Sequence, residues 1–395
     1  MEKPKIRFKG YQEDWEQRKL GEVFKEYSEK NHTELPALTI IQGGGTVKRE
    51  ESDRNLMYDE SNLSNYKMVR KDDFIVHLRS FEGGLEKSLL DGIISPAYHT
   101  FHSDVADSRF YYPYFRSHEF IKHKLVPHVY GIRDGRSIDI AGMKTIEIPY
   151  TSIEEQRKIG DYLESLDHLI TLHQRKCEEM KTLKKYMLQK MFPQNGQSVP
   201  QIRFSGFTED WEQRKLGDVF EQTSNLVNPK EDEIELWSLT VEDGLTKKSD
   251  RYNREFLVKK DDNFKEVRPG DIVYNPMNMT LGAVGYNGMA KSVAVSGYYT
   301  TMVAKENYDT YYINTWLKSP QAIRLYRTYA TGSLIEKQRV QFPTLSIIPV
   351  TFPKYEEQIK IGSYFHSLDN LITLHQQKCD ELRNIKKFML QNMFI

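Results

Sequence analysis

Hydrophobic side chains recur at helical spacing in two stretches of the chain, residues 165–192 and 367–394. Aligned without a gap, the stretches differ at only nine of 28 positions, a likeness that chance does not produce. Start signals extend both helices towards the N-terminus, because Ser152 and Glu155 have capping-box spacing and Pro353 precedes two acidic residues. Each helix then spans about 38 residues, or about 57 Å at about 1.5 Å per residue. The pattern predicts a tandem duplication in which each domain-sized copy ends in the same long helix.

The apolar positions of these helices follow heptads, which predicts that the two helices pack together. A helix of this length has little stability alone and must bury its apolar stripe. Duplication within one chain favours an internal two-fold axis, and helices related by an axis perpendicular to them run antiparallel. His173 and His375 lie near the helix midpoints, so we expect them to approach each other. The expected seam is Leu166, Leu169, His173, Lys176, Met180, Leu183 and Met187, matched by Leu368, Leu371, His375, Lys378, Leu382, Ile385 and Met389.

A short arm stands before each copy of the domain. Residues 6–8 (IRF) and 14–21 (DWEQRKLG) recur as residues 202–204 and 210–217. The first helix leads into the second arm through residues 193–200, whose Pro, Gly, Asn and Gln content is typical of a linker. By the same geometry the second helix should end beside the first arm. We therefore expect the chain termini to lie close together, with the two domains at opposite ends of a two-helix spacer.

The segments between arm and helix, residues 22–150 and 218–352, have diverged in sequence but keep the same order of elements. A tight turn precedes a buried strand at residues 69–76 and again in the second copy, and one amphipathic helix follows at 111–125 and 311–326. The expected fold class is α+β: two mixed α/β domains and two long helices in an antiparallel coiled coil, with an internal pseudo-two-fold repeat. The predicted divisions are residues 1–21 (first arm), 22–150 (first domain), 151–192 (first helix), 193–217 (linker and second arm), 218–352 (second domain) and 353–395 (second helix).

Composition excludes several classes of protein. With 12% aromatic residues and a formal net charge of zero, the chain is neither disordered nor a polycation that coats nucleic acid. It has no apolar run near the roughly 18 residues of a membrane span and no secretory signal after Met1, so no membrane association is expected. Cys177 and Cys379 occupy equivalent helix positions and do not suggest a disulfide framework, which makes a reducing cytoplasm the expected location. Because both domains are slightly acidic, a DNA-binding surface would have to be local or shared with a partner.

The order of the repeated motifs resembles that of one family. The motifs are residues 15–21 with 211–217, the Glu-Glu-Gln sequences at 154–156 and 356–358, and the paired helices. Each motif alone has limited specificity, but their duplicated order covers the whole chain. The chain resembles the specificity subunit of a type I DNA restriction–modification system.

The resemblance implies a function that the residues alone do not show. In that family each of two target-recognition domains recognises one half of a split DNA site, and the conserved helices fix the gap between the halves. The subunit has no catalytic centre, and it assembles with two modification (methyltransferase) subunits and with restriction subunits that cleave DNA using ATP. The implied partners are double-stranded DNA and these subunits. No cofactor is expected in this chain, whereas S-adenosylmethionine, ATP and Mg are expected on the partner subunits.

Two motifs permit a chemical interpretation of the domains. Asn275-Pro276-Met277-Asn278 is similar to the Asn/Asp-Pro-Pro-aromatic sequence with which adenine methyltransferases hold a flipped base. The second proline and the aromatic residue are missing, and no Gly-rich cofactor loop precedes the motif, which favours a simple turn after a strand. Residues 43–49 (GGGTVKR) lack the spacing of a phosphate-binding loop and are typical of a flexible loop with a basic edge.

The helices offer one possible metal site. His173 with Cys177 and His375 with Cys379 would place four N and S ligands near the expected dyad, and zinc takes such ligands. The alternative is that the histidines set the helix register while the cysteines pack as small apolar groups. We expect no metal.

Candidate DNA contacts are polar side chains on predicted loops, because Arg, Lys, Asn and Gln match the hydrogen-bonding groups of base edges. Ordinary surface charge is the alternative for each of them. The repeated arm residues Arg18, Lys19, Arg214 and Lys215 instead suit packing or partner docking. The candidates are Lys48, Arg49, Arg54, His77, Arg79, Lys87, Arg133 and Arg136 in the first domain, and Lys247, Lys248, Arg251, Asn275, Asn278, Lys337 and Arg339 in the second.

Two other functions stay open at this point. One is a catalytic DNA adenine methyltransferase, for which the sequence lacks both the motif and the cofactor loop. The other is a bivalent coiled-coil adaptor that joins proteins without binding nucleic acid.

Overall fold

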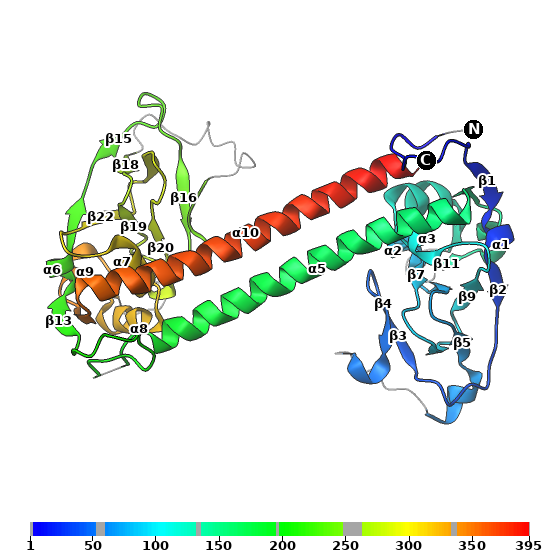
Figure 1. Cartoon of the computed structure of the whole chain (residues 1–395), viewed down its shortest axis with the longest axis horizontal. Coiled ribbons are helices and arrows are strands. Elements are labelled where there is room, and N and C mark those ends of the chain that lie inside the picture. Colours follow the sequence, from blue (N-terminus) through cyan, green and yellow to red (C-terminus); the bar gives the residue numbers. More distant parts are fainter. Residues whose placement is uncertain are drawn as a thin grey trace. The chain divides into compact units, whose positions relative to one another are not determined.

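Two long helices carry the repeat that the sequence predicts, α5 (Ile153–Lys190) and α10 (Tyr355–Met393). The computed structural model describes residues 3–52, 60–131, 136–194, 197–247, 263–332 and 338–394. The chain divides into unit 1, residues 1–174 with 377–395, and unit 2, residues 175–376. Each unit therefore contains one recognition-type domain, half of α5 and half of α10 (Figure 1).

Unit 1 is built on a four-stranded antiparallel sheet in the order β2-β9-β6-β7. The buried strand is the one predicted after a tight turn, in which Asp72 adopts a φ of 73°. Smaller pairs flank the sheet: β1 with β12, β3 with β4, β5 with β8, and β10 with β11. The strands are β1 (Glu16–Lys19), β2 (Lys25–Tyr27), β3 (Leu38–Ile41), β4 (Gly45–Lys48), β5 (Lys67–Val69), β6 (Phe74–Val76), β7 (Glu86–Lys87), β8 (Gly92–Ile94), β9 (His99–His102), β10 (Val129–Tyr130), β11 (Ser137–Ile138) and β12 (Glu147–Tyr150).

Short helices cover one side of this sheet and join it to the long helices (Figure 1). Their aromatic side chains pack edge to face in the core, as Phe74 does with Phe115 at 4.9 Å between ring centroids. The core continues into the long helices through buried Leu166 of α5 and Leu382 of α10. The helices are α1 (Leu20–Val23), α2 (Ser80–Gly83), α3 (Ser108–Phe115) and α4 (Ile140–Met143), with a π-helix, η3 (Glu119–Leu125), and 3₁₀ turns η1 (Arg49–Glu51), η2 (Glu60–Asn65) and η4 (Val126–His128).

Unit 2 repeats this architecture although its sequence has diverged. Its main sheet has the order β14-β22-β19-β20, which matches β2-β9-β6-β7 strand for strand. The turn before the buried strand contains Gly270, with a φ of 87°, where unit 1 has Asp72. The elements are β13 (Glu212–Lys215), β14 (Phe220–Thr223), β15 (Leu226–Val227), β16 (Trp237–Thr240), β17 (Gly244–Lys247), β18 (Phe264–Val267), β19 (Ile272–Tyr274), β20 (Val284–Tyr286), β21 (Val293–Ser296), β22 (Thr300–Ala304), β23 (Pro349–Phe352), α6 (Leu216–Val219), η7 (Met279–Leu281), α7 (Thr310–Leu317), α8 (Pro320–Tyr329) and α9 (Phe342–Ser346).

The single amphipathic helix predicted in each domain is wrong, because each is broken into two. In unit 2 the break lies at Ser319-Pro320, where the Ser319 hydroxyl caps α8 by accepting from the backbone N–H of Ala322. In unit 1, α3 ends at Phe115, and Ser117 accepts from the N–H of Phe120 as the π-helix begins. A serine that can cap a new helix competes with continuing the old one. Apolar periodicity alone does not report this break.

The long helices run antiparallel within each unit. In unit 1, Asp167 pairs with Lys386 at 2.5 Å, while Ile170 accepts through its carbonyl from the thiol of Cys379 at 3.7 Å. Rising residue numbers along α5 thus meet falling numbers along α10. Unit 2 contains the same two contacts with the helices exchanged, between Lys184 and Asp369 and between Cys177 and Ile372. The predicted fold class, including its repeat and its antiparallel helix pair, is confirmed.

One row of the predicted seam is displaced by a single residue. Leu169 and Leu371 are exposed at 40% and 42%, and the buried or partly buried positions beside them are Ile170 and Ile372. From Leu166 the buried positions follow at intervals of four and then three residues. The predicted positions followed at intervals of three and then four. Both 169 and 170 are aliphatic, so the sequence pattern does not choose between them. By the same shift Cys177 and Cys379 are buried in place of Lys176 and Lys378.

The other predicted seam residues lie on the packed side of the helices. Leu368 is buried in unit 2, as Leu166 and Leu382 are in unit 1. His173 and His375 are half-buried, and their expected approach stays a prediction. Partly buried members that pack against the cores are Met180, Leu183 and Met187 in unit 2, and Ile385 and Met389 in unit 1.

The end of each helix lies beside an arm, as the duplication predicts. In unit 1 the N–H of Ile6 donates to the carbonyl of Asn392 at 3.0 Å, which brings the two ends of the chain together. In unit 2 the N–H of Ile202 donates to the carbonyl of Lys190 at 2.9 Å. The same packing thus joins helix and arm whether or not a linker connects them.

None of the described helices is long and apolar enough to cross a membrane. The described residues also contain no cluster of three or more His, Cys, Asp or Glu side chains that could hold a metal ion.

Candidate nucleic-acid interface

The junction of arm, helix and domain in unit 1 is centred on one buried carboxylate, Glu155. Its two oxygens accept from the Arg7 guanidinium at 2.5 and 2.7 Å, and one also accepts from the Trp15 indole N–H at 3.1 Å and from the Thr151 hydroxyl. Ser152 caps the helix by accepting from the N–H of Glu155 at 3.3 Å, as predicted. The Glu155 side chain, however, is hydrogen-bonded to arm residues and does not complete the capping box. A buried charge needs such partners, so the arm is tied firmly to the start of α5.

The glutamine that follows this glutamate holds the domain. The Gln156 side chain accepts from the backbone N–H of Asp107, the N-cap of α3, and donates to the carbonyl of Thr151. In unit 2 Gln358 accepts from the N–H of Asp309 and donates to the carbonyl of Pro353. The repeated Glu-Gln pair thus orients each domain against its long helix.

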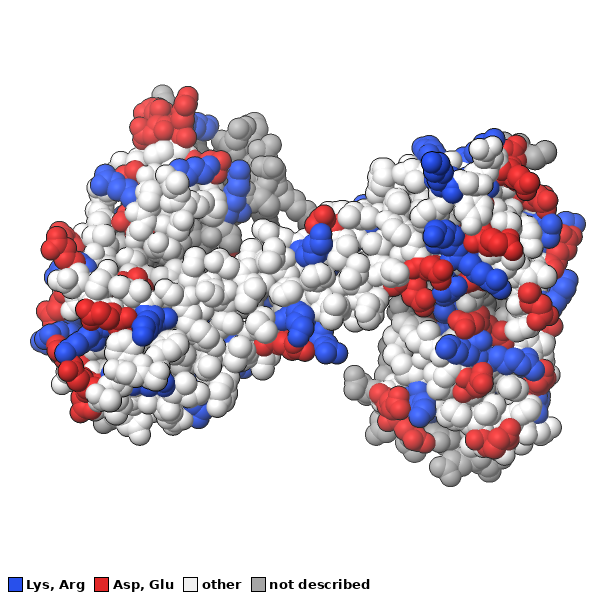
Figure 2. All heavy atoms as spheres, in the orientation of Figure 1, with Lys and Arg blue, Asp and Glu red and all other residues white. Residues whose placement is uncertain are grey.

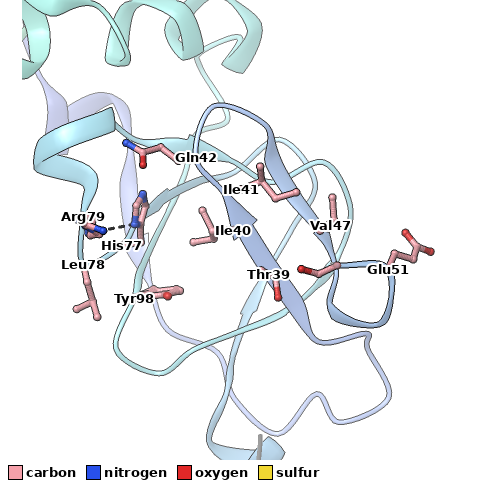
Figure 3. A pocket seen from close by; sticks show the side chains of 11 residues that line it. Thr39, Ile40, Ile41, Gln42, Val47, Glu51, His77, Leu78, Arg79 and Tyr98 are labelled. Carbon is pink, nitrogen blue, oxygen red and sulfur yellow. Dashed lines mark hydrogen bonds between the residues drawn. The ribbon is translucent and has the colours of Figure 1, made fainter. Parts of the chain in front are cut away.

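A hollow with a volume of about 540 Å³ lies on the domain of unit 1. One wall is the hairpin β3–β4 with the 3₁₀ turn that follows it, and the other is the loop after β6 together with Tyr98 (Figure 3). The lining combines apolar and polar side chains, a mixture that is typical of ligand-binding cavities. The residues are Thr39, Ile40, Ile41, Gln42, Val47, Glu51, Ser52, His77, Leu78, Arg79 and Tyr98.

His77 contributes a neutral ring to the floor of this hollow. Burial, together with the positive charge of Arg79, lowers the pKa of His77 to about 4. The Nδ1 atom accepts from the backbone N–H of Arg79 at 3.3 Å, so in the neutral ring the proton resides on Nε2. Nε2 is buried and has no hydrogen-bond partner among the described residues. The ring also packs edge to face with Tyr98, at 6.2 Å between centroids.

The glycine run at 43–45 forms the tight turn of the hairpin, with φ values of 85° at Gly43 and 72° at Gly45. The backbone N–H groups of Gly43 and Gly45 donate to the buried carboxylate of Glu86 at 2.7 and 3.2 Å. Tyr112 and Arg116 donate to the same carboxylate at 2.7 and 2.8 Å. These N–H groups are therefore occupied by an internal anion, and the run fixes the hairpin tip instead of forming a mobile loop.

Comparison with known proteins gives this architecture a family. The model of the type I restriction modification DNA specificity domain matches the chain twice, over residues 12–182 and 208–384. The chain belongs to this family. Each matched segment contains an arm, a domain and most of a long helix, so the specificity domain corresponds to the structural repeat.

Individual relatives are distant in sequence. The MjaX type I restriction enzyme specificity subunit of Methanocaldococcus jannaschii is 24% identical over 277 residues, which are 64% of this chain and 59% of that protein. The match thus spans less than two thirds of the relative. The crystal structure of a type I restriction-modification S subunit from M. genitalium superposes with a TM-score of 0.63 at 15% identity, over 100% of this chain and 99% of the other. A subunit from Thermoanaerobacter tengcongensis gives a TM-score of 0.45 at 16% identity, over 96% of each chain.

Of the contact residues predicted in the first specificity domain, the structure places His77 and Arg79 in the lining of the hollow. Arg79 lies on the loop wall; its side chain is 71% exposed, and its guanidinium lies 3.0 Å from the Glu82 carboxylate. Arg136 lies over the ring of Phe81 at 4.5 Å and also faces Glu82. Lys48 ends β4 and Arg49 begins the 3₁₀ turn η1, whose last residue, Glu51, lies 3.6 Å from the Lys48 ammonium.

Lys87 does not lie on a loop edge, where we predicted it as a DNA contact. It lies in β7, only 9% exposed, and its ammonium is 2.8 Å from the Asp72 carboxylate. The prediction treated the residue as part of a loop edge, but strand β7 turns its side chain inwards. Lys87 forms an ion pair with Asp72 that stabilises the turn before β6.

In the second specificity domain, predicted DNA contacts lie at the end of β17 and in the segment after β19. Lys247 is exposed at the end of β17 and lies 3.4 Å from Glu235. Asn275 accepts from the backbone N–H of Met277, so the Asn-Pro-Met-Asn sequence forms a turn, the favoured interpretation. Asn278 is exposed beside it, and Arg339 is exposed in a bridge with Thr331.

Five predicted contacts lie outside the described residues: Arg54, Arg133, Lys248, Arg251 and Lys337.

The arm residue Arg18 stacks on the ring of Tyr150 at 3.8 Å, which is the packing role expected for it. On the face seen in Figure 2, positive and negative side chains are interspersed over each unit.

Gln42 and Tyr98 are among the lining residues that sequence reasoning missed. Gln42 directly precedes the glycine run, and a tight hairpin would have placed it at an exposed tip. Tyr98 lies just before β9 and carried no charge or motif that singled it out.

Proposed function

We propose that the chain is the DNA-recognition subunit of a type I restriction–modification complex, in which each specificity domain recognises one half of a split DNA site. The observation that carries this proposal is the contrast inside the repeat. The arm, helix and Glu-Gln junction recur in both units, whereas the hairpin tips differ, with Gln42-Gly43-Gly44 in one and Val241-Glu242-Asp243 in the other. A site with unlike halves requires one support and two different contact surfaces.

The helix pair would set the distance between the half-sites. Its residues are largely preserved between the two copies, and Gln156 and Gln358 couple it directly to the domains. The near-dyad of duplex DNA favours supports with two-fold symmetry.

Partner subunits would dock on the outer face of the helices. Leu169 and Leu172 of unit 1 are exposed one helical turn apart, and Leu371 and Leu374 of unit 2 repeat them. Exposed apolar residues in contiguous groups mark interaction surfaces. Two equivalent groups support the docking of two copies of one subunit, for which a modification subunit is our candidate.

The chain itself would have no catalytic part. Methyl transfer and ATP-driven cleavage, with S-adenosylmethionine, ATP and Mg, would belong to the modification and restriction subunits. DNA recognition together with them would also place the chain in the cytoplasm, as its cysteines predict.

The test is a domain exchange. Residues 22–150 are replaced by the corresponding segment of another specificity subunit, and methylated adenines are mapped in cells that carry its modification subunit. We expect one half of the recognised site to change while the other half and the gap stay the same. A change in both halves, or methylation that follows no split sequence, would contradict the proposal. Methyl transfer by the purified chain alone would instead support a catalytic methyltransferase.

A further inference from the structure

Gln42 occupies an unusual position at the mouth of the hollow in unit 1. It is exposed at the tip of the hairpin β3–β4 and lies beside the ring of His77 (Figure 3). Among the residues that the structure describes, its side-chain amide has no hydrogen-bond partner. One acceptor and one N–H₂ donor therefore remain uncommitted at an exposed site.

Packing, and not hydrogen bonding, holds this amide in place. A Cβ atom added to Gly83 of α2 would lie 2.1 Å from the Gln42 amide nitrogen and 2.8 Å from its amide carbon. The side chain thus rests against the backbone of α2, in a space that exists only because residue 83 is glycine. An exposed glutamine normally samples many rotamers, so this contact reduces the entropy that binding would cost.

The hairpin beneath Gln42 is equally well fixed. The next residue and Gly45 donate their N–H groups to the buried Glu86 carboxylate, which Arg116 neutralises. The tip therefore cannot tilt without breaking its hydrogen bonds to a buried carboxylate. Such a support is what a contact residue needs to discriminate between ligands.

We propose that Gln42 is a specificity-determining residue of unit 1 and that its amide hydrogen-bonds the major-groove edge of an adenine in one half-site. A glutamine amide donates to adenine N7 and accepts from the N6 amino group, which other bases do not offer together. Gly83 is its positioning residue. This inference rests on the proposed function, and it assigns a named side chain to one base pair of the split site.

The apolar walls of the hollow suit the surroundings of such a contact. Ile40 and Val47 line the hairpin side, and Leu78 is 61% exposed at the rim. Apolar side chains recognise the methyl group of thymine, which lies in the same groove as the adenine edge. The hollow thus offers an amide and aliphatic groups to the two bases of A·T pairs.

The experiment compares three variants of the full chain, each assembled with its modification subunit. Gln42→Ala removes the amide. Gly83→Ala leaves the amide but displaces it, and is expected to fold, because the added methyl meets only the far end of a flexible side chain. Val241→Ala is the matched control, since Val241 occupies the hairpin position of unit 2 that corresponds to Gln42.

Each complex selects binding sites from a duplex library with randomised half-sites, and the selected sequences are read out. We expect the Gln42→Ala and Gly83→Ala complexes to discriminate about tenfold less at the same A·T pair of one half-site. We expect the Val241→Ala complex to discriminate at that pair as the unmodified complex does. Replacing the adenine with 7-deazaadenine, which lacks N7, should weaken binding of the unmodified chain and leave Gln42→Ala unchanged.

Unaltered discrimination in the Gln42→Ala complex would overturn the inference, as would an equal loss over all sequences. Both outcomes leave the proposed function standing as long as the unmodified complex selects a split site. If the unmodified complex selects no sequence, the proposed function itself fails.

Discussion

The two units build the same junction with different numbers of hydrogen bonds. In unit 1 the Glu155 carboxylate accepts from Arg7, Trp15 and Thr151. In unit 2 the equivalent Glu357 accepts only from Arg203, at 2.7 and 2.8 Å, among the described side chains. The indole N–H of Trp211 is buried there and has no hydrogen-bond partner among the described residues, and Pro353 replaces the threonine. The ion pair is thus the part of the junction that both copies retain, whereas the hydrogen bonds from neutral donors occur in unit 1.

The domains differ more deeply than the junctions. Behind the hairpin of unit 1, Glu86 is neutralised by Arg116. Unit 2 has Gly285 at the strand position of Glu86 and Lys318 at the helix position of Arg116. A buried acid and its cation have been replaced by a glycine and a lysine. The interior of the domain could diverge because only its connection to the helix has to stay constant.

The largest effect that tests this comparison comes from removing each arginine. Arg203→Met leaves Glu357 as a buried charge without a side-chain donor, and we expect it to destabilise the junction of unit 2 by about 3–5 kcal/mol. Arg7→Met leaves Glu155 two donors, so the expected cost in unit 1 is smaller, about 1–3 kcal/mol. Hydrogen exchange of residues 6–21 and 202–217 measures both.

The control for this pair is Arg18→Met, which removes an exposed ion pair with Glu16 and the stacking on Tyr150 but leaves no buried charge, and should cost about 1 kcal/mol or less. Equal costs for Arg7→Met and Arg203→Met would mean that the neutral donors of unit 1 contribute nothing, and the comparison would fail.

Exchanging the two tryptophans for phenylalanine tests the neutral donors directly. Trp15→Phe removes a hydrogen bond to a buried carboxylate and should cost about 1.5–3 kcal/mol, plus the lost ring contacts. Trp211→Phe removes a donor that is already without a partner, so only the ring contacts are lost. The difference between the two free energies of unfolding isolates the hydrogen bond. If Trp211→Phe lowers the free energy of unfolding more than Trp15→Phe does, the Trp211 indole N–H must donate to an acceptor outside the described residues.

The repeat and its consequences could be predicted from the sequence, because the same motifs recur at a fixed order. The helix bounds, the antiparallel pairing and the position of the second helix end beside the first arm all followed from the duplication. The exact seam could not, since 169 and 170 are both aliphatic and only packing selects Ile170. The hollow could not either, because it forms between Gln42 and His77, segments whose separation in space no periodicity reports.

Lys318, which stands where unit 1 has Arg116, predicts that the stability of unit 2 depends on pH. Burial lowers the pKa of Lys318 to about 8, and the charge of Lys184 acts in the same direction. Between about pH 8 and the ordinary lysine pKa of about 10.4, the unfolded chain binds a proton that the folded chain does not. The free energy of unfolding therefore rises with pH across this window.

The contribution of Lys318 to this rise should be about 1–2 kcal/mol, less than the full pKa shift implies, because the side chain is partly exposed. Other groups also titrate here, so the measurement is the difference between the unmodified chain and Lys318→Met in urea unfolding at pH 8 and pH 10. The variant should lack the rise. An identical pH dependence of both proteins would show that Lys318 stays protonated in the folded state.

The smallest expected effect concerns the two ion pairs between the helices, which have the same sequence in both units. Lys386 in unit 1 pairs with an aspartate that is 55% exposed, whereas Lys184 in unit 2 pairs with Asp369, which is 34% exposed and also accepts from the Tyr311 hydroxyl at 2.6 Å. Half-exposed pairs contribute less than about 1 kcal/mol. Lys184→Met should cost slightly more than Lys386→Met, and salt of about 1 M should remove most of the difference. Urea unfolding with and without salt checks both. A cost of several kcal/mol for either would mean that the pairs specify the antiparallel register, whereas the expected small values leave that role to the buried seam, where Ile170 and Cys177 lie.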